Sequence, residues 1–553
     1  MLNLSTLNPQ QRHAVEHIRG PMLILAGAGT GKTRVITHRI AHMVELGIAP
    51  HQILAVTFTN KAAREMRERV RKLIPRRRAA AGATQSANPT IGTFHSFCVK
   101  ILRQHIEHLG YKRNFVIYDE SEQLAAVRKL MSNITAKGEK TDPRAILTML
   151  SRVRLQESAD ALFTDPSAAA LARHIQAKYE STLRASNAVD FDDLLLLTLR
   201  LFHEHPQVLA QSQEQFQYVM VDEYQDTSAA QFRLVHSLTR HHSNLCVVGD
   251  DDQSIYGWRG AEIKNLLNLE QFYPGLKIIK LEQNYRSTNT ILTAANALIR
   301  NNAQRRPKNL WSENGQGDRI LIQTFPNEEE EARTIVETID YARKMNQIPW
   351  SSQAILFRTN GQSRPLETAL RQAGVRYHLI GGQSFFDRRE IKDLIAYLKV
   401  LINPHDDISL LRIANVPARG LSTTTMERLL STSQERDSSV YAAMRHTDVQ
   451  DSLLSRTREA VLEFLSWIDK TRAPLEGDGS LSLAIWANAF LSDIEYWTEL
   501  RRSEKNPETA ESRVQNLKDL IAVLDKRQTQ GQTPIECLEG FLEELVLDPD
   551  RGN

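Results

Sequence analysis

The sequence predicts an α/β fold in which short parallel strands alternate with helices over roughly the first 380 residues. Two observations support this prediction. Short, almost entirely apolar runs recur between segments with helical spacing, which is typical of strands buried on both faces of a parallel sheet. One of these runs, 22–25, leads into a glycine-rich loop followed by a helix-compatible segment, 34–46. We therefore expect parallel sheets covered by helices on both faces.

The predicted strands share this apolar composition: 22–25, 53–58, 218–221, 245–248, 276–281, 320–325, 354–357 and 377–380. Residues from about 113 to 188 show helical spacing and no convincing strand, which predicts a helical insertion in the first α/β domain. From about residue 381 to the end the pattern is again mainly helical. The length of 553 residues is enough for roughly three or four domains.

Composition and charge exclude several classes of protein. The 69 basic and 66 acidic residues give a net charge of +3, so net charge alone does not indicate a nucleic-acid partner. Cys98, Cys246 and Cys537 are far apart and lack partners at metal-ligand spacing, which predicts buried or incidental thiols in a reducing compartment. The N-terminus has no signal-peptide pattern, and no apolar run is long enough to span a membrane. We expect a cytoplasmic protein.

The segment AGAGTGKT at 26–33 predicts a phosphate-binding loop. A strand, a glycine loop, Gly-Lys-Thr and a helix follow one another, so backbone N–H groups of the loop face the phosphates. Lys32 reaches the β and γ oxygens, and the hydroxyl of Thr33 holds Mg²⁺. Ala26 stands where the strict pattern has glycine. The alternative, a glycine-rich turn that binds nothing, is disfavoured because both the strand and the helix are in place.

A second acidic element follows the apolar strand 218–221, where Asp222 and Glu223 are adjacent. At the carboxyl edge of a parallel sheet, Asp222 can hold Mg²⁺ and Glu223 can orient and deprotonate the attacking water. Two adjacent acids in an exposed loop are the ordinary alternative. The strand before them, in a chain that already has a phosphate-binding loop, favours catalysis.

The next strand ends in VGDDDQSIYGWRG at 248–260. Gln253 is neutral and could sense the γ-phosphate or its attacking water. Tyr256 and Trp258 place aromatic faces beside Arg259, a combination that grips single-stranded nucleic acid because stacking tolerates any base. The alternative is that both aromatic residues belong to the core, but the flanking Gly and Asp residues favour a loop.

A further strand ends in LEQNYRS at 281–287. Arg286 could bond a phosphate in a bidentate manner, and Tyr285 could stack on adenine. A surface arginine beside a packed tyrosine remains the alternative.

Taken together, these segments resemble the UvrD/Rep/PcrA-type DNA helicases of superfamily 1. The matching stretches, in family order, are LNPQQ (7–11), AGAGTGKTR (26–34), TFTNKAAREM (57–66), GTFHSF (92–97), DFDDLL (190–195), VDEYQDT (221–227), VGDDDQSIYGWRGA (248–261), LEQNYRS (281–287), LFRTNGQSR (356–364) and GGQSFFDRREIKDLIAYL (381–398). The resemblance implies a P-loop NTPase with two RecA-like motor domains, ATP between them, and a mainly helical insertion in each.

The resemblance also implies domain boundaries. The first motor domain would comprise 1–112 and 189–280, interrupted by the insertion 113–188. The second would begin at 281–380 and carry the insertion 381–553. The family's later motifs, one similar to TxHxxKGLEF and one bearing an arginine, are absent from the sequence. We therefore expect an incomplete second motor domain with uncovered apolar surface, and weak ATP hydrolysis by this chain alone.

The resemblance implies roles for the nucleotide-binding residues, which are Gln11, Ala26, Gly27, Ala28, Gly29, Thr30, Gly31, Lys32, Thr33, Arg34 and Tyr285. Gln11 would read the adenine edge, and Tyr285 would stack on the base. Lys32, Thr33 and Arg34 would serve the phosphates and Mg²⁺.

The implied catalytic residues are Lys32, Asp222, Glu223, Gln253 and Arg286. Asp222 would join Thr33 in holding the metal, and Glu223 would act as the base. Gln253 and Arg286 would contact the γ-phosphate region.

The implied single-strand track consists of Phe58, Thr93, His95, Tyr256, Trp258, Arg259, Arg358 and Asn360. Two of these residues have ordinary alternatives. His95 could be a loop histidine bonded to backbone, and Phe58 could simply be core.

The function implied is an ATP-dependent DNA helicase or translocase. It would bind single-stranded DNA and junctions with duplex, and move 3′→5′ by resemblance, in DNA repair or replication. Two alternatives stay open. A helicase–nuclease subunit would need a carboxylate-rich nuclease domain, which these residues do not contain. A truncated, catalytically weak fragment would bind nucleotide and single-stranded DNA without efficient turnover.

Overall fold

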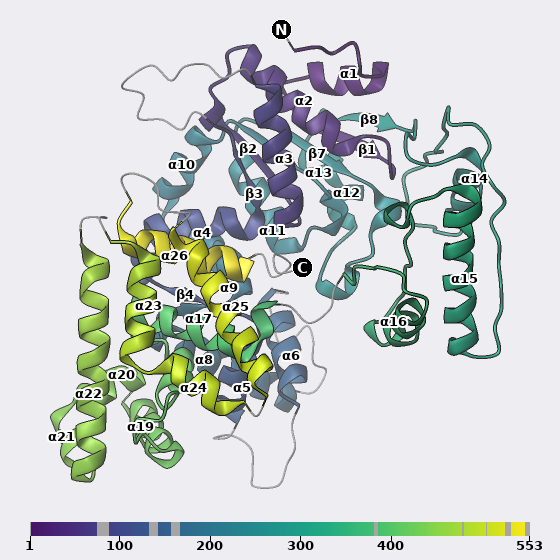
Figure 1. The fold of residues 1–553 in the computed structure, drawn as a ribbon. Helices are drawn as coiled ribbons and strands as arrows, with labels where there is room; N and C mark the ends of the chain where they lie inside the picture. Colours follow the sequence, from purple (N-terminus) through teal and green to yellow (C-terminus); the bar gives the residue numbers. More distant parts are fainter. Residues whose placement is uncertain are drawn as a thin grey trace. The chain divides into compact units, whose positions relative to one another are not determined.

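The computed structural model (Figure 1) describes residues 2–74, 88–131, 142–155, 166–380, 385–436, 438–477, 481–504, 506–525 and 532–547. The first four residues of the 381–398 stretch therefore lie outside the described residues. The chain divides into two compact units, one formed by 1–316 with 393–548 and the other containing 317–392. Each unit is described by itself. No helix among the described residues is both long enough and apolar enough to cross a membrane.

Six parallel strands form the main sheet, in the order β3-β2-β6-β7-β1-β8. Their bounds are β1 (Met22–Ala26), β2 (Ile53–Thr57), β3 (Thr90–Thr93), β6 (Tyr218–Val221), β7 (Leu245–Gly249) and β8 (Lys277–Leu281). Five of them occupy segments that the sequence predicted as strands. The edge strand β3 was not predicted. Because all six strands run the same way, the loops after β1, β6 and β7 meet at one edge of the sheet.

Alternate residues of the strands face two separate cores. One core contains Leu23 and Leu25 of β1, together with residues of the helices on one face of the sheet. The other core contains Met22 and Ile24 of the same strand, together with residues of the helices on the opposite face. This arrangement explains the continuous apolar runs, because a strand covered on both faces has no polar side.

Helices cover both faces of this sheet. The first layer consists of α1 (Pro9–Glu16), α2 (Lys32–Glu45) and α3 (Asn60–Leu73). The second layer includes α4 (Phe94–His105), α9 (Phe191–Glu204), α10 (Pro206–Gln215), α11 (Ala229–Thr239), α12 (Lys264–Leu267) and α13 (Leu269–Phe272). Cys98 lies in this layer, and Cys98, Cys246 and Cys537 are all free and buried, as predicted.

The predicted insertion is mainly helical, with α5 (Glu120–Met131), α6 (Pro143–Leu155) and α8 (Pro166–Ala185) around their own core. It is not free of strands, however. β4 (Val116–Ile117) pairs in parallel with β5 (Ala188–Val189). Two-residue strands are too short to leave a periodic pattern, so the sequence did not reveal them.

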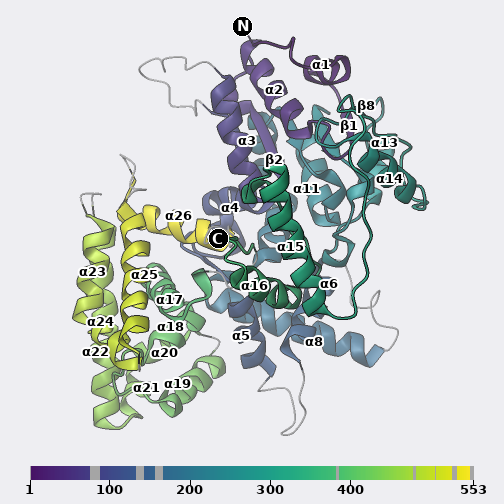
Figure 2. The same ribbon diagram turned by 45° about the vertical axis from the view of Figure 1, so that its right-hand side comes forward.

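A second set of helices follows from residue 389 onward, and α20 to α25 gather together in both views (Figures 1 and 2). The bounds are α17 (Arg389–Ile402), α18 (Asp407–Ile413), α19 (Thr423–Glu435), α20 (Val440–Arg445), α21 (Thr447–Asp451), α22 (Ser455–Arg472), α23 (Leu483–Asp493), α24 (Tyr496–Ser503), α25 (Pro507–Asp525) and α26 (Pro534–Leu547). These helices contact the insertion through buried polar groups. Lys399 Nζ bonds Glu122 Oε1 at 2.6 Å, and Tyr118 Oη donates to Asp406 Oδ1 at 2.8 Å.

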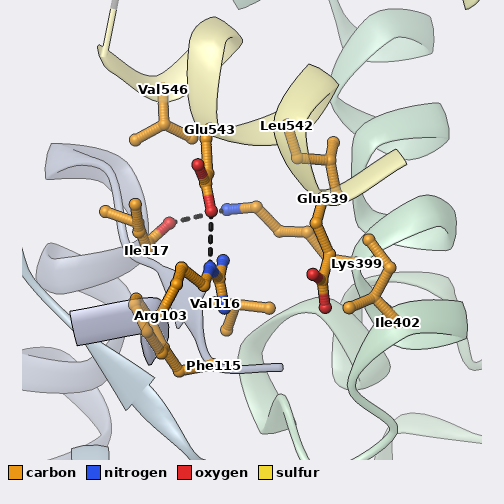
Figure 3. Close-up of a pocket in the computed structure, with 10 residues that line it drawn as sticks. All are labelled: Arg103, Phe115, Val116, Ile117, Lys399, Ile402, Glu539, Leu542, Glu543 and Val546. Atoms are coloured by element: carbon orange, nitrogen blue, oxygen red, sulfur yellow. Dashed lines mark hydrogen bonds and ion pairs between the residues drawn. The ribbon is translucent and has the colours of Figure 1, made fainter. Parts of the chain in front are cut away.

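Helix α26 packs against α4 through an ion pair beside an aromatic ring (Figure 3). Arg103 Nε lies 2.5 Å from Glu543 Oε1, and the guanidinium carbon of Arg103 lies 3.8 Å from the centre of the Phe115 ring. A planar cation over an aromatic face combines electrostatic attraction with apolar packing. This contact anchors α26 to α4.

The unit containing 317–392 has α15 (Glu328–Asn346) and α16 (Ser363–Gln372) around a small core of Val336, Leu370 and Val375. The strands predicted at 320–325, 354–357 and 377–380 are wrong: none of these segments forms a strand. Each segment has a largely exposed apolar side chain, with exposed fractions of 82% for Ile380, 91% for Ile322 and 94% for Leu356, although Ile355 and Tyr377 pack against the small core. A strand requires a hydrogen-bonded neighbour, and an apolar run alone does not supply one.

Candidate nucleotide and nucleic-acid site

The loop between β1 and α2 holds two glycines in a left-handed conformation. Gly29 has φ +70° and Gly31 has φ +91°. A Cβ at Gly29 would come 2.7 Å from Arg286 Cβ, and a Cβ at Gly31 would come 2.8 Å from Gln11 Nε2. Both the backbone conformation and the close neighbours therefore require glycine. The same geometry places Gln11 and Arg286 beside the loop.

Gln11 is buried and bonds directly to the loop. Its Nε2 donates to the Thr30 carbonyl at 2.9 Å, and its Oε1 accepts from the Asn8 backbone N–H at 3.1 Å. Asn8 extends this contact, since its Nδ2 donates to Tyr285 Oη at 2.9 Å. The two residues predicted to hold the base are thus joined through Asn8, which the sequence analysis missed. Its only sequence signal is an N-cap position before α1.

The ammonium of Lys32 is paired with Glu223, at 2.9 Å between Nζ and Oε2. Burial and the neighbouring Glu223 charge raise the pKa of Asp222 to about 7. Glu223 has φ +50°, an uncommon value for a residue other than glycine. A phosphate entering the loop would compete with the Glu223 carboxylate for Lys32.

Asp222 and Thr33 are hard oxygen donors, the kind that Mg²⁺ prefers. Asp222 is buried, and its pKa is raised because burial and the charge of Glu223 disfavour the ionised carboxylate more than Lys32 stabilises it. A divalent cation would offset that cost. The residues present therefore fit a magnesium ion.

Gln225 connects the acids after β6 to the loop after β7. Its Nε2 donates to Glu223 Oε2 at 2.9 Å, and its Oε1 accepts from the Asp250 backbone N–H at 2.9 Å. Asp250 Oδ2 in turn accepts from Gln253 Nε2 at 2.5 Å. A continuous chain of polar contacts thus runs from Lys32 to Gln253. The sequence analysis missed Gln225, because nothing local distinguishes a bridging glutamine from an exposed one.

Asn284 fixes the segment that carries Arg286 against the loop. Its Nδ2 donates to the Ala28 carbonyl at 2.5 Å, and its Oδ1 accepts from the backbone N–H of Arg286 at 2.8 Å. The backbone N–H of Tyr285 also donates to the Gly29 carbonyl, at 2.9 Å. Arg34, by contrast, donates from Nη2 to the Thr6 carbonyl at 3.1 Å, away from the loop interior.

An aromatic cluster is formed by Tyr256 and Trp258, in the loop that follows Gln253, with Phe58, which directly follows β2. The ring centres of Phe58 and Tyr256 are 5.2 Å apart and stacked, and those of Tyr256 and Trp258 are 6.5 Å apart. The Arg259 guanidinium carbon lies 4.7 Å from the Trp258 ring centre. Trp258 is 73% exposed, which excludes it from the core. The cluster offers a free aromatic face beside a positive charge.

The remaining predicted track residues have mixed surroundings. Thr93 caps α4, its Oγ1 accepting from the Ser96 backbone N–H at 3.1 Å. Burial lowers the pKa of His95 to about 4, so its ring is neutral, and it packs edge-on against Phe191 with ring centres 5.4 Å apart. Arg358 and Asn360 are exposed in the unit containing 317–392 and are described within that unit alone.

Comparison with known proteins gives matches along almost the whole chain. Residues 7–274 match the UvrD/REP helicase N-terminal domain, and residues 279–552 match the UvrD-like helicase C-terminal domain. The chain is 41% identical over 551 residues to the ATP-dependent DNA helicase PcrA of Bacillus subtilis (strain 168), covering 99% of this chain and 72% of that protein. The PcrA of Leuconostoc citreum is 39% identical over 552 residues, covering 98% of this chain and 72% of the relative.

Proposed function

Because this chain belongs to the UvrD/PcrA-type family of ATP-dependent DNA helicases, we propose that it hydrolyses ATP with Mg²⁺ while bound to single-stranded DNA. It then moves 3′→5′ along that strand into junctions with duplex, in repair or replication. One observation carries most of the proposal. The phosphate-binding loop, the acids after β6 and Gln253 are joined by one chain of polar contacts, and Gln253 lies in the loop that bears the aromatic cluster.

The chemistry begins with an exchange of partners. When the triphosphate enters, Lys32 leaves Glu223 for the β and γ oxygens, which frees Glu223 to orient the attacking water and accept its proton. Thr33 and Asp222 would hold Mg²⁺, and the bound ion would neutralise phosphate charge. Gln253 and Arg286 contact the γ-phosphate, so the site distinguishes the triphosphate from the diphosphate.

Gln253 and Tyr256 lie in the same loop, three positions apart, and this proximity couples nucleotide hydrolysis to movement along DNA. A displacement of Gln253 after loss of the γ-phosphate shifts the loop that holds Tyr256 and Trp258. Bases stack on these rings without sequence preference, so the strand can step past them.

The proposal is tested with duplexes that carry a single-stranded tail on either end. With Mg²⁺ and ATP, we expect unwinding of the 3′-tailed duplex and ATP hydrolysis that rises when single-stranded DNA is added. Unwinding of the 5′-tailed duplex alone would overturn the polarity, and an absence of both nucleotide and oligonucleotide binding would overturn the function.

A second candidate is a chain that binds nucleotide and single-stranded DNA but turns over slowly. The exposed apolar side chains at 320–325 and 354–357 favour it, because a motor domain transmits force through a covered sheet. Tight binding of ATP and oligonucleotide with little DNA-stimulated hydrolysis would select this candidate.

A further inference from the structure

A buried ammonium lies among three consecutive carboxylates directly after β7. Lys308 Nζ is 2.8 Å from Asp250 Oδ1, 2.5 Å from Asp251 Oδ1 and 2.7 Å from Asp252 Oδ2, and its side chain is only 2% exposed. Arg305 adds two bonds to Asp252, at 2.7 Å from Nε and 2.8 Å from Nη2. No local sequence pattern predicts a role for either basic residue.

The carboxylates are arranged as they would be around a metal ion. In the part of the chain that the structure describes, Asp250, Asp251 and Asp252 are the one group of three potential ligands whose atoms lie within 4.8 Å of one another. An ammonium has three donors, and here each one meets a different carboxylate. Lys308 therefore serves as a built-in cation, covalently tied to the chain.

Asp250 links the Lys308 ammonium to the side chain of Gln253. Its Oδ1 faces Lys308, its Oδ2 accepts from Gln253 Nε2 at 2.5 Å, and its backbone N–H donates to Gln225 Oε1. A carboxylate held at both oxygens and at its backbone has one orientation. The Gln253 amide bonded to it is fixed accordingly.

The segment 308–311 also reaches the other side of the nucleotide site. Leu310 covers the loop so closely that a Cβ at Gly27 would collide with its side chain. The backbone of Trp311 accepts a hydrogen bond at 2.7 Å from the N–H of Asn284, the residue that holds Arg286 against the loop. One short segment thus supports both predicted γ-phosphate contacts.

We propose that Lys308 is a positioning residue for recognition of the γ-phosphate. It fixes Gln253 through Asp250 and ties that contact to the segment bearing Arg286. This proposal rests on the proposed function, because it concerns how the same site distinguishes ATP from ADP. Lys308 itself touches no nucleotide; it acts through Asp250 and Gln253.

The test compares affinity for ADP with affinity for a non-hydrolysable ATP analogue, each with Mg²⁺, by titration calorimetry. Lys308→Met removes the charge and keeps the length of the side chain. We expect the analogue to bind about tenfold more weakly, the loss of roughly one hydrogen bond to a charged group, while ADP affinity stays within about twofold. A general loss of folding would instead weaken the binding of ADP and of the analogue by similar factors.

Lys280→Met is the matched control. Lys280 is exposed and donates to the carbonyl of Pro307 at 2.6 Å, next to Lys308 but away from the carboxylates. We expect the same ratio of affinities as in the parent chain. In a chain that already carries Gln253→Ala, Lys308→Met should produce no further change in that ratio, because the Gln253 amide through which Lys308 acts is already absent.

If Lys308→Met does not fold, Asp250→Asn tests the same link, because an amide cannot accept from both Lys308 and Gln253 in the present geometry. An unchanged ratio in Lys308→Met, or in Asp250→Asn where the first variant does not fold, would overturn the role of Lys308. Failure of the parent chain to bind either nucleotide would instead overturn the proposed function itself.

Discussion

At the scale of single residues, the candidate site consists of polar groups held by other polar groups. Lys32 bonds Glu223, and Gln225 links Glu223 to Asp250, so each side chain has a defined orientation before any ligand binds. Lys32 must exchange Glu223 for phosphate, but the bonds from Gln225 to Asp250 and from Gln253 to Asp250 are already in place, which limits the reorganisation that a ligand requires. Single substitutions should therefore have large effects, and substitutions within this network should be coupled.

Replacement of the loop lysine should strongly weaken nucleotide binding. Lys32→Met removes the charge that faces the β and γ oxygens, and we expect ATP affinity to fall by about 100-fold, corresponding to roughly 3 kcal/mol. The measurement is titration with a fluorescent ATP analogue. Lys61→Met, on the exposed side of α3, is the control. Survival of tight ATP binding in Lys32→Met would contradict the phosphate-binding loop.

Replacement of the exposed indole should weaken single-stranded DNA binding without regard to sequence. Trp258→Ala removes a stacking face, which corresponds to about 1–3 kcal/mol per base. We expect similar losses for oligo(dT) and oligo(dA), measured by fluorescence anisotropy. Ile255→Ala is a matched control, because Ile255 is 69% exposed in the same loop but offers no ring. Equal losses in the two variants would argue against stacking.

At the scale of elements, one buried arginine joins helix α6 to the start of α9. Arg154 of α6 bonds Asp190 at 2.7 Å and also pairs with Asp193, both at the start of α9. Tyr179 of α8 donates to Asp190 as well, at 3.0 Å. Burial and then the charge of Asp190 raise the pKa of Asp193, and the charge of Arg154 opposes this rise. The DFDDLL motif therefore has a structural role here.

Loss of this arginine should destabilise the protein. Arg154→Met leaves two buried carboxylates without their cation, and we expect the free energy of unfolding to fall by about 3–5 kcal/mol. Urea denaturation followed by circular dichroism measures it. Arg152→Met, two residues earlier on the exposed side of the same helix, should change stability by less than about 0.5 kcal/mol. Equal stability of the two variants would show that the network contributes nothing.

His405, in the connection between α17 and α18, should make the free energy of unfolding depend on pH. Burial, and then the charges of Lys112, Arg472 and Arg445, lower the pKa of His405 to about 4. The folded state thus favours the neutral ring, whose Nδ1 lies 2.6 Å from Ser439 Oγ. The associated stability is fully present above the unfolded pKa of about 6.5 and is lost as the pH falls toward about 4.

His405→Gln removes the titrating group, so its melting temperature should fall less between pH 7 and pH 4.5 than that of the parent chain. Differential scanning fluorimetry across that range is the measurement. His446→Gln, at an exposed position in the same region, should keep the parent slope. A steeper fall in His405→Gln would contradict the sign of the effect.

At the scale of the whole molecule, the two units differ in how their backbone N–H and C=O groups are hydrogen-bonded. The first unit has a six-stranded sheet with a core on each face. In the described part of the other unit, helices α15 and α16 surround a core of three buried residues, and no strand is present. Local stability follows the density of buried apolar contacts and shielded hydrogen bonds.

Hydrogen exchange should separate the two units. We expect amides of β1 and β7 to exchange only through global unfolding, and amides of 320–325 and 354–357 to exchange at rates close to those of an unstructured peptide. Mass spectrometry of the exchanging chain measures both sets in one experiment. Strong protection at 320–325 would mean that this segment pairs with another strand in solution.

Much of the site could be predicted from the sequence because its signals are local. The strand, loop and helix around Lys32, and the acids after 218–221, each depend on residues within a few positions of one another. The supporting contacts are not local. Asn284 bonds a carbonyl 256 positions away, and Lys308 bonds a carboxylate 57 positions away. No pattern within a window could pair them.

The amino-acid order by itself determined which residues gather at the sheet edge, because parallel strands bring their following loops together. Tertiary structure alone decided which polar group holds which, and whether an apolar run becomes a strand. Residues 22–25 form one between two neighbours, while 320–325 have the same character and form none. The reason is that hydrogen bonding in a sheet belongs to pairs of segments, and a single segment cannot specify its partner.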